Sequence, residues 1–299
     1  MNPIDWIDAN IVDLLNGLSL GMLLFIVAVG LSLVFGMMDV LNLAHGALFL
    51  AGAYVGVAVL GDGEVGLAVF ALALLVAAAV GVVSGAALAG LTRPLAHRGH
   101  LDQALLTLGI ALVVADGLAA IFGEDVQSVP APAGIDGRVS VLGHTYPTYR
   151  LVLIGVGLAL AVVVHAVLER TALGAVVRAT VADRAMVRAV GIDTRKVLLG
   201  VFVFAAVLAM VGGLLAAPVL GAQPGLDDRM LLLALVVVVV GGLGSVRGAL
   251  VGALLIGQVQ VLGVSLLPEY ASFLLFGAMA LVLLLRPAGL LPAKSGVPA

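Results

Sequence analysis

Apolar runs of about 20 residues recur along most of this 299-residue chain, and they leave few folds open. A run of that length is what an α-helix needs to cross a hydrocarbon layer of roughly 30 Å. Hydrophobic residues make up 63% of the chain and charged residues 10%, whereas about a quarter of a soluble domain is charged. The runs are continuous and lack the alternation of short barrel strands, so we expect an all-α polytopic helix bundle in a membrane.

Polar segments divide the chain into eight or nine expected membrane segments within one domain, residues 1–299. The expected segments are 11–35, 40–60, 66–91, 104–122, 151–168, 197–220, 230–242, 248–263 and 270–285. The seventh and eighth are short or broken helices joined near Arg247, and a re-entrant segment there would change the number of full crossings. Residues 123–149 form the longest irregular stretch, rich in proline and glycine, and are expected to be an external loop.

The basic residues indicate an orientation. The expected inner segments 92–103, 169–196, 243–248 and 286–299 contain 2, 6, 1 and 2 of them, which is 11 of the 14 in the chain. Because basic residues concentrate in cytoplasmic loops, we expect the N-terminus outside and the C-terminus inside. The acidic start, with Asp5, Asp8 and Asp13, does not resemble a cleaved signal peptide, so the first apolar run is expected to remain.

Glycines four residues apart are expected to form flat strips where helices pack closely, since lipid gives no hydrophobic drive for association. The expected packing glycines are Gly52, Gly56, Gly81, Gly85, Gly244, Gly248 and Gly252. A weak internal echo links 42–56 with 245–257, because both open with a polar or basic residue before Gly-Ala-Leu. A true repeat would place the two copies in the same direction, and chance similarity of glycine-rich sequence is the alternative.

Catalytic motifs are missing from the sequence. A phosphate-binding loop needs Gly-Lys-Ser/Thr, but Lys196 follows Arg195 and Lys294 follows Ala293. The five histidines show no metal-ligand spacing, cysteine is absent, and no Gly-x-Ser-x-Gly elbow occurs. We therefore expect no catalytic residue, no metal and no enzyme activity in this chain, and any ATP hydrolysis must come from a partner.

Polar residues inside apolar segments are costly, so they are candidates for a translocation path. The candidates are Ser19, Asn42, His45, Asp116 and Gln258, with Ser32 adding to the lining of the first two segments. His45 has an alternative role, a hydrogen bond at a helix start that holds the break near Asn42. Asp116 has two, a pair with an arginine of another helix or a neutral, hydrogen-bonded carboxyl inside the bundle.

Three ordered motifs, which together extend over most of the chain, resemble the branched-chain amino acid ABC transporter permeases. Residues 17–56 resemble the opening of that family, with Asn-x-Ala-His-Gly at 42–46. Residues 170–197 resemble its cytoplasmic loop, with an Arg-Thr-x-x-Gly opening and a Gly-Ile close. Residues 239–257 resemble its Gly-Gly-x-Gly-Ser segment, although Arg247 stands where proline or a neutral residue is as often expected. The length is similar to that of the smaller of the two permease types.

The resemblance implies a bacterial inner-membrane importer for branched-chain amino acids or related small amides. It implies a second related permease, two cytoplasmic ATPases that hold ATP and Mg, and a periplasmic or lipid-anchored binding protein, with membrane lipid around the permease and no nucleic acid. Whether the permeases form a homodimer or a heterodimer stays open, as does the exact substrate. A stand-alone secondary carrier or channel for a small solute is the main alternative, and a structural membrane scaffold is a second.

The basic segment 169–196 is the expected ATPase-coupling loop, with one amphipathic helix at 176–190. At 100° per residue, its apolar positions fall within about one third of the circumference, with two arginines along one edge. The expected coupling residues are Val176, Ala179, Asp183, Arg184, Met186, Val187, Arg188, Val190 and Gly191. Asp183 interrupts the apolar face, and it is expected to cap a bend, to pair near Arg184 or to contact the ATPase. The alternative for the whole helix is an interfacial position on anionic lipid.

Overall fold

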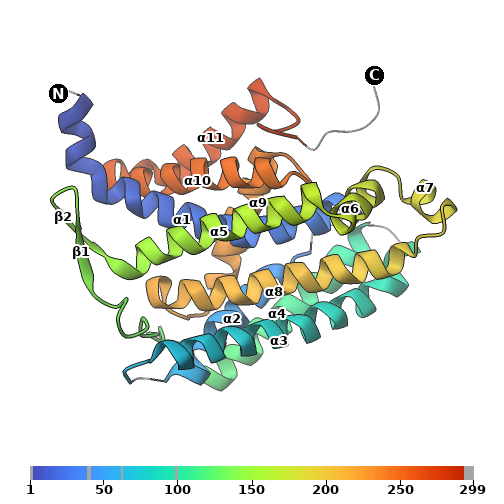
Figure 1. Cartoon of the computed structure of the whole chain (residues 1–299), viewed down its shortest axis with the longest axis horizontal. Coiled ribbons are helices and arrows are strands. Elements are labelled where there is room, and N and C mark those ends of the chain that lie inside the picture. The colour runs from blue at the N-terminus through green and yellow to red at the C-terminus, as the bar shows by residue number, and fades with distance from the viewer. Residues whose placement is uncertain (1–2, 39–41, 62, 98–99, 293–299) are drawn as a thin grey trace.

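A computed structural model describes residues 3–38, 42–61, 63–97 and 100–292, which fold into a helical bundle with a small hairpin at one end (Figure 1). The helices are α1 Pro3–Met38, α2 Ala44–Leu60, α3 Leu67–Thr92, α4 His100–Phe122, α5 Thr148–Arg170, α6 Ala172–Ala182, α7 Arg184–Ala189, α8 Thr194–Leu220, α9 Leu226–Gly241, α10 Val246–Leu266 and α11 Ala271–Leu285. The short 3-10 turns η1 Arg93–His97 and η2 Pro268–Tyr270, and the strands β1 Arg138–Val141 and β2 His144–Pro147, complete the described structure.

The expected all-α polytopic bundle is confirmed. Within the described ranges, seven helices are long and apolar enough to cross a membrane, and the shorter α2 and α9 lie among them. The helix α9 begins at Leu226, four residues before the expected start, because Gly225 adopts a left-handed φ of 84° and two aspartates favour the first turn. The expectation of two short helices here is wrong for α10, which runs for 21 residues.

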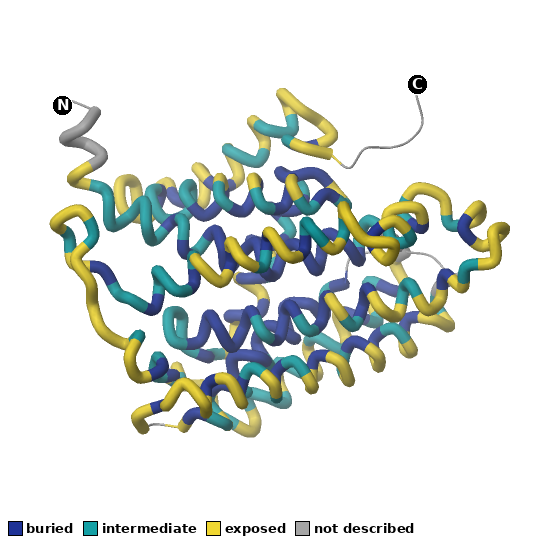
Figure 2. Tube along the Cα trace, in the orientation of Figure 1, coloured by how far each residue is buried: buried dark blue, intermediate teal, exposed yellow. Residues whose placement is uncertain are grey.

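The helix α1 forms the centre of the bundle. It packs against α5, α8, α9 and α10, and every residue from 21 to 34 is buried. In Figure 1, α3 and α4 lie on one side of this centre, and α10 and α11 lie on the other. Figure 2 shows the same arrangement as a dark interior flanked by helices whose outer faces are exposed. The outer faces of α3, α4, α5 and α11 carry large apolar side chains, as a lipid-facing surface requires.

Small residues let the helix backbones approach closely. A Cβ at Gly81 or Gly85 of α3 would lie 2.7 Å from the Cα of Val207 or Val203 of α8, which leaves no room for a larger residue. Gly52 faces the Met210 carbonyl, Gly248 faces the Gly241 carbonyl, and a Cβ at Gly252 would lie 2.7 Å from the Val237 carbonyl oxygen. Gly56 has ordinary clearance.

The expected place of Gly244 in a helical strip is wrong. It lies in the connection between α9 and α10 with a φ of 72°, a conformation that glycine adopts without strain. The Gly36 end of α1 meets this connection, since a Cβ at Gly36 would lie 2.9 Å from the Gly244 Cα. The two segments of the internal echo also differ at their starts, because Ser245 caps α10 through the Gly248 amide, whereas Leu43 gives α2 no side-chain cap.

The segments expected to be cytoplasmic meet at one end of the bundle. The position of Gly36 is close to Gly244 and Val181, and the amide of Leu290 donates to the Val240 carbonyl. Arg93, Arg184, Arg188 and residues 191–196 line one cavity. The expected outer segments meet at the opposite end, where Ala133 bonds to Val65 and Gln127 pairs with Ala222. The fold therefore places the basic segments at one end of the bundle.

The expected external loop is not wholly irregular. Residues 138–147 form an antiparallel hairpin in which Val139 pairs with Tyr146, and α5 already begins at Thr148. The two turn residues Leu142 and Gly143 have φ values of 50° and 87°, as a tight hairpin turn requires. Tyr146 is fully buried, so the hairpin is fastened to the end of the bundle.

Candidate functional site

The basic segment 169–196 folds as two helices with a sharp break between them, so the expected single helix at 176–190 is wrong. The first helix, α6, ends where the amide of Asp183 donates to the Ala179 carbonyl. Asp183 itself has an extended backbone, and its carboxylate accepts a hydrogen bond of 2.9 Å from the Met186 amide at the start of α7. Of the roles open to Asp183, the structure shows a cap at a bend, because short polar side chains satisfy the free amides of a helix start.

The Arg-Thr-x-x-Gly motif forms the turn between α5 and α6. The hydroxyl of Thr171 accepts a hydrogen bond of 3.1 Å from the Gly174 amide and caps α6. Gly174 lies directly against the carbonyl groups of Val167 and Leu168, so any side chain there would collide with the end of α5. The motif therefore lets two helices follow each other with one residue between them.

The Gly-Ile motif closes the segment. Gly191 adopts a left-handed φ of 87°, and the Ile192 amide donates across 3.2 Å to the Val187 carbonyl. This is a Schellman termination, in which glycine takes the position that other residues enter only with strain. Asp193 then caps α8 by accepting a hydrogen bond of 3.0 Å from the Arg195 amide. Capped turns at both ends thus hold α7 between α6 and α8.

The apolar side chains exposed on this segment differ from those expected. Met186 is 62% exposed and Val190 is 67% exposed, as expected for a docking face, but Val187 is only 5% exposed and packs within its own chain. The break at Asp183 rotates α7 away from the phase of a continuous helix, which explains the burial of Val187. Ala179 is exposed and Val176 is half-buried. Leu173, which the sequence reading missed, is 75% exposed at the start of α6.

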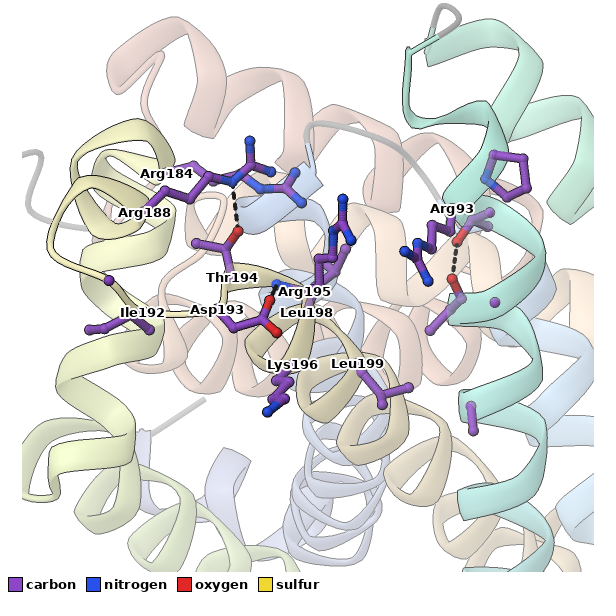
Figure 3. A pocket seen from close by; sticks show the side chains of 16 residues that line it. Arg93, Arg184, Arg188, Ile192, Asp193, Thr194, Arg195, Lys196, Leu198 and Leu199 are labelled. Carbon is purple, nitrogen blue, oxygen red and sulfur yellow. Dashed lines mark hydrogen bonds between the residues drawn. The ribbon is translucent and has the colours of Figure 1, made fainter.

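An open cavity of about 1320 Å³ separates the α7–α8 region from the end of α3 (Figure 3). Five basic residues line it, namely Arg93, Arg184, Arg188, Arg195 and Lys196. The Nε of Arg188 donates across 2.9 Å to the Thr194 hydroxyl, whereas the buried Nε of Arg184 has no partner among the described residues. Burial, and secondarily the neighbouring Arg188, lowers the pKa of Arg184. The segment therefore ends in a concentrated positive charge.

The polar residues proposed for the first two segments are enclosed inside the bundle. Ser19, Ser32, Asn42 and His45 are all buried. The His45 ring Nε2 lies 3.0 Å from the Val27 carbonyl of α1, so its contact crosses from α2 to the neighbouring helix. The alternative role for His45 is a hydrogen bond at the start of its own helix. Only its backbone amide makes such a bond, by donating to the Asn42 carbonyl. These side chains lie at helix contacts, and none of them lines the cavity.

The remaining path candidates lie in two other places. Gln258 of α10 donates across 2.9 Å to the Leu14 carbonyl, so it joins α10 to α1. Asp116 is exposed halfway along α4, and its carboxylate makes no hydrogen bond or ion pair with a described residue. The described residues therefore provide neither of the expected alternatives, an arginine partner or an internal hydrogen bond.

Several buried polar atoms around α1 lack a partner among the described residues. They are Ser19 Oγ, Ser32 Oγ, Asn42 Oδ1, His45 Nδ1 and Gln258 Oε1. An unsatisfied polar atom in an apolar interior costs about 1–3 kcal/mol. A fold retains such atoms where another conformation, a ligand or water satisfies them, so the surroundings of α1 are a second candidate site.

The membrane-spanning bundle and its capped basic segment define a helical membrane protein of the transport class. The family described as branched-chain amino acid transport system, permease component, matches residues 13–284, and the chain belongs to this family.

Curated relatives match over nearly their full length. The chain is 28% identical to the high-affinity branched-chain amino acid transport system permease protein BraD of Pseudomonas aeruginosa, covering 93% of this chain and 94% of the relative. It is 27% identical to the corresponding protein LivH of Escherichia coli, with the same coverage. A probable LivH of the archaeon Methanocaldococcus jannaschii is 28% identical over 92% of this chain and 88% of the relative. No solved structure matches the chain.

Proposed function

We propose that this chain is the permease subunit of an ATP-driven importer for branched-chain, aliphatic amino acids or related small amides. The observation that carries the proposal is the α6–α7 segment, which exposes Leu173, Met186 and Val190 at the basic end of a bundle of this family. The chain has no phosphate-binding loop of its own. The exposed apolar side chains give a soluble ATPase a surface to bind.

The connections of this segment suit mechanical coupling. One residue, Thr171, separates α5 from α6, and the short turn 190–193 separates α7 from α8. Both α5 and α8 pack against the central α1. Because packed helices shift as rigid bodies, a displacement of α7 by a closing ATPase pair would reach α1 through two routes.

The proposed orientation follows from charge. The end of the bundle that gathers the basic segments is the cytoplasmic end, so the N-terminus is outside and the C-terminus inside a bacterial inner membrane. Two ATPases that bind ATP and Mg would dock at this end. A periplasmic or lipid-anchored binding protein would deliver substrate at the end formed by the hairpin and the 221–225 turn.

The second permease is proposed to cover α4. A carboxylate that faces hydrocarbon halfway along a helix costs at least ~2.5 kcal/mol, and Asp116 has no partner among the described residues. A related permease against this face would supply a donor. The substrate path would then open beside α1, where Ser19, Asn42, His45 and Gln258 hold the buried polar atoms that a moving α1 would expose.

The docking surface is tested by the double variant Met186→Glu and Val190→Glu in the complete transporter. We expect loss of ATPase co-purification and of ATP-driven uptake, since two carboxylates would enter an apolar contact. Leu142→Glu is the control for ATPase co-purification, because Leu142 is also an exposed apolar residue but lies at the opposite end of the bundle. Normal ATPase binding and uptake by the double variant would overturn the docking role.

A reconstitution distinguishes the importer from a stand-alone carrier. Vesicles that contain this chain alone should show no amino-acid flux, and flux should require the second permease, the ATPases and ATP. Flux by the chain alone would contradict the proposal, whatever the result for the docking variant.

A further inference from the structure

The cavity between α3 and the α7–α8 region has two chemically different halves (Figure 3). Toward the membrane its walls are small and apolar, with Ala86, Ala89 and Gly90 from α3 facing Leu198 and Leu199 from α8. The rest of its lining contains the five basic residues, four of them arginines. An apolar groove that ends at a cluster of cations matches a molecule with hydrocarbon at one end and negative charge at the other.

The basic end has an unbalanced charge. Among the described residues that line it, Asp193 has the single carboxylate, and that group already accepts a hydrogen bond from the Arg195 amide at the start of α8. The half-buried Arg184 stands beside Arg188, with its Nε unpartnered among the described residues. Burial and this like charge both lower the pKa of Arg184, so its surroundings disfavour the charged form of the guanidinium group. An anion held between the arginines would remove both penalties through charge-assisted hydrogen bonds.

The apolar half is open to the lipid-facing surface. A Cβ at Gly90 would meet no atom within 4 Å, so space is available beside α3. Leu91, which follows Gly90 in α3, and Leu199 of α8 are exposed. Further large apolar side chains are exposed along α3. The volume of about 1320 Å³ is far larger than a phosphate ion requires, and it suits a glycerophosphate group with the first part of its chains.

The geometry of α7 separates this cavity from the docking surface. Arg184 and Arg188 are four residues apart and line the cavity, whereas Met186 and Val190 lie two residues further along. Two residues correspond to about 200° around a helix, so the two pairs occupy opposite sides of α7. A soluble ATPase bound to Met186 and Val190 would therefore leave the cavity accessible from the membrane.

We propose that this cavity binds one anionic phospholipid of the surrounding membrane. Its phosphate lies among Arg93, Arg184 and Arg195, and its acyl chains follow the groove between α3 and α8. Basic pockets between helices at the cytoplasmic side are recognised lipid-headgroup sites in other membrane proteins. The bound lipid would neutralise the charge at the base of α7 and stiffen its junction with α8. The proposal requires the basic end to face the cytoplasmic leaflet.

Native mass spectrometry of the full permease, purified in detergent with its second permease, tests the inference. After exchange into mixed lipid, we expect one retained phosphatidylglycerol, preferred at least tenfold over phosphatidylcholine. The double variant Arg93→Gln and Arg195→Gln should lose this preference, and it leaves α7 unchanged. The matched control Arg170→Gln with Arg178→Gln removes two exposed arginines outside the cavity and should retain it.

A second variant tests the apolar half. The Cβ of Gly90→Leu would meet no atom within 4 Å, so we expect a folded protein with weakened binding of long-chain phosphatidylglycerol. Equal lipid retention by both double variants would overturn the proposal. Protection against thermal unfolding by inorganic phosphate that matches the effect of phosphatidylglycerol would replace it with a simple anion site. Loss of ATPase binding in Arg93→Gln with Arg195→Gln, with lipid retention unchanged, would instead make the cavity part of the ATPase contact.

Discussion

The main-chain amide of Met186 donates a 2.9 Å hydrogen bond to the Asp183 carboxylate, and this bond starts α7. Replacing Asp183 with alanine removes the cap at a cost of about 1 kcal/mol, so the first turn of α7 should fray. Amino acid taken up per ATP hydrolysed, measured in the complete transporter, should fall severalfold. Asp183→Asn keeps a capping oxygen and should restore most of the coupling.

Asp136 supplies the control for this prediction. Its carboxylate accepts a hydrogen bond of 3.1 Å from the Gly134 amide, but in the loop at the opposite end of the bundle. Asp136→Ala should leave the ratio of uptake to hydrolysis unchanged. Equal losses for Asp136→Ala and Asp183→Ala, or no rescue by asparagine, would show that the cap has no part in coupling.

Helix packing at Gly85 predicts a loss of stability. A Cβ there would lie 2.7 Å from the Val203 Cα and 2.9 Å from the Phe202 carbonyl oxygen, so α3 and α8 must separate. We expect Gly85→Ala to cost about 1–3 kcal/mol, as overpacking does in other cores. Thermal unfolding in detergent measures the effect. Gly155→Ala on α5 meets no atom within 4 Å and should be neutral, and a similar loss at both sites would contradict the packing argument.

The unpartnered Ser19 hydroxyl predicts a different result, loss of transport without loss of stability. Ser19→Ala removes a buried polar atom that has no partner among the described residues, so the protein should unfold at the same or a higher temperature. If the hydroxyl lines the path when α1 shifts, uptake should slow severalfold. Ser84→Ala is the control, since the Ser84 hydroxyl bonds within its own helix to Val80. Unchanged uptake in Ser19→Ala would remove Ser19 from the path.

The exposed Asp116 predicts the position of the second permease. Asp116→Leu should reduce co-purification of that subunit at least tenfold if α4 is the contact. The donor group of the second permease would then lose its ion pair or hydrogen bond with the carboxylate. Asp102→Leu, at the aqueous end of the same helix, should have no effect. Full co-purification of Asp116→Leu with improved thermal stability would place this face of α4 against lipid.

The positions of the helices could be predicted from the sequence because a membrane span needs a long apolar run. The helix expected at 197–220 is α8 at Thr194–Leu220, and the gathering of the basic segments at one end follows from the same runs. The hairpin was missed because the prolines around it indicate irregular chain. The available signal was Leu142–Gly143 between two alternating strands.

The break at Asp183 could not be predicted from periodicity. Apolar residues at helical spacing lie on both sides of Asp183, and only its side-chain cap shows that α7 starts a new phase. Val187 is buried for this reason, although a continuous helix would place it beside Val190. The sequence also showed which spans carry polar residues, but not whether they face their own subunit. His45 and Gln258 bond to α1, whereas Asp116 faces outward.

The enclosed position of α1 has a consequence for biosynthesis. This helix leaves the ribosome before α8, α9 and α10, which pack around it and end as late as residue 266. At ~5–20 residues per second, α1 waits roughly 10 to 45 s for these neighbours. During that interval its glycines and buried serines face lipid or the insertion machinery. Its apolar composition therefore has to hold it across the membrane alone, long before the bundle closes around it.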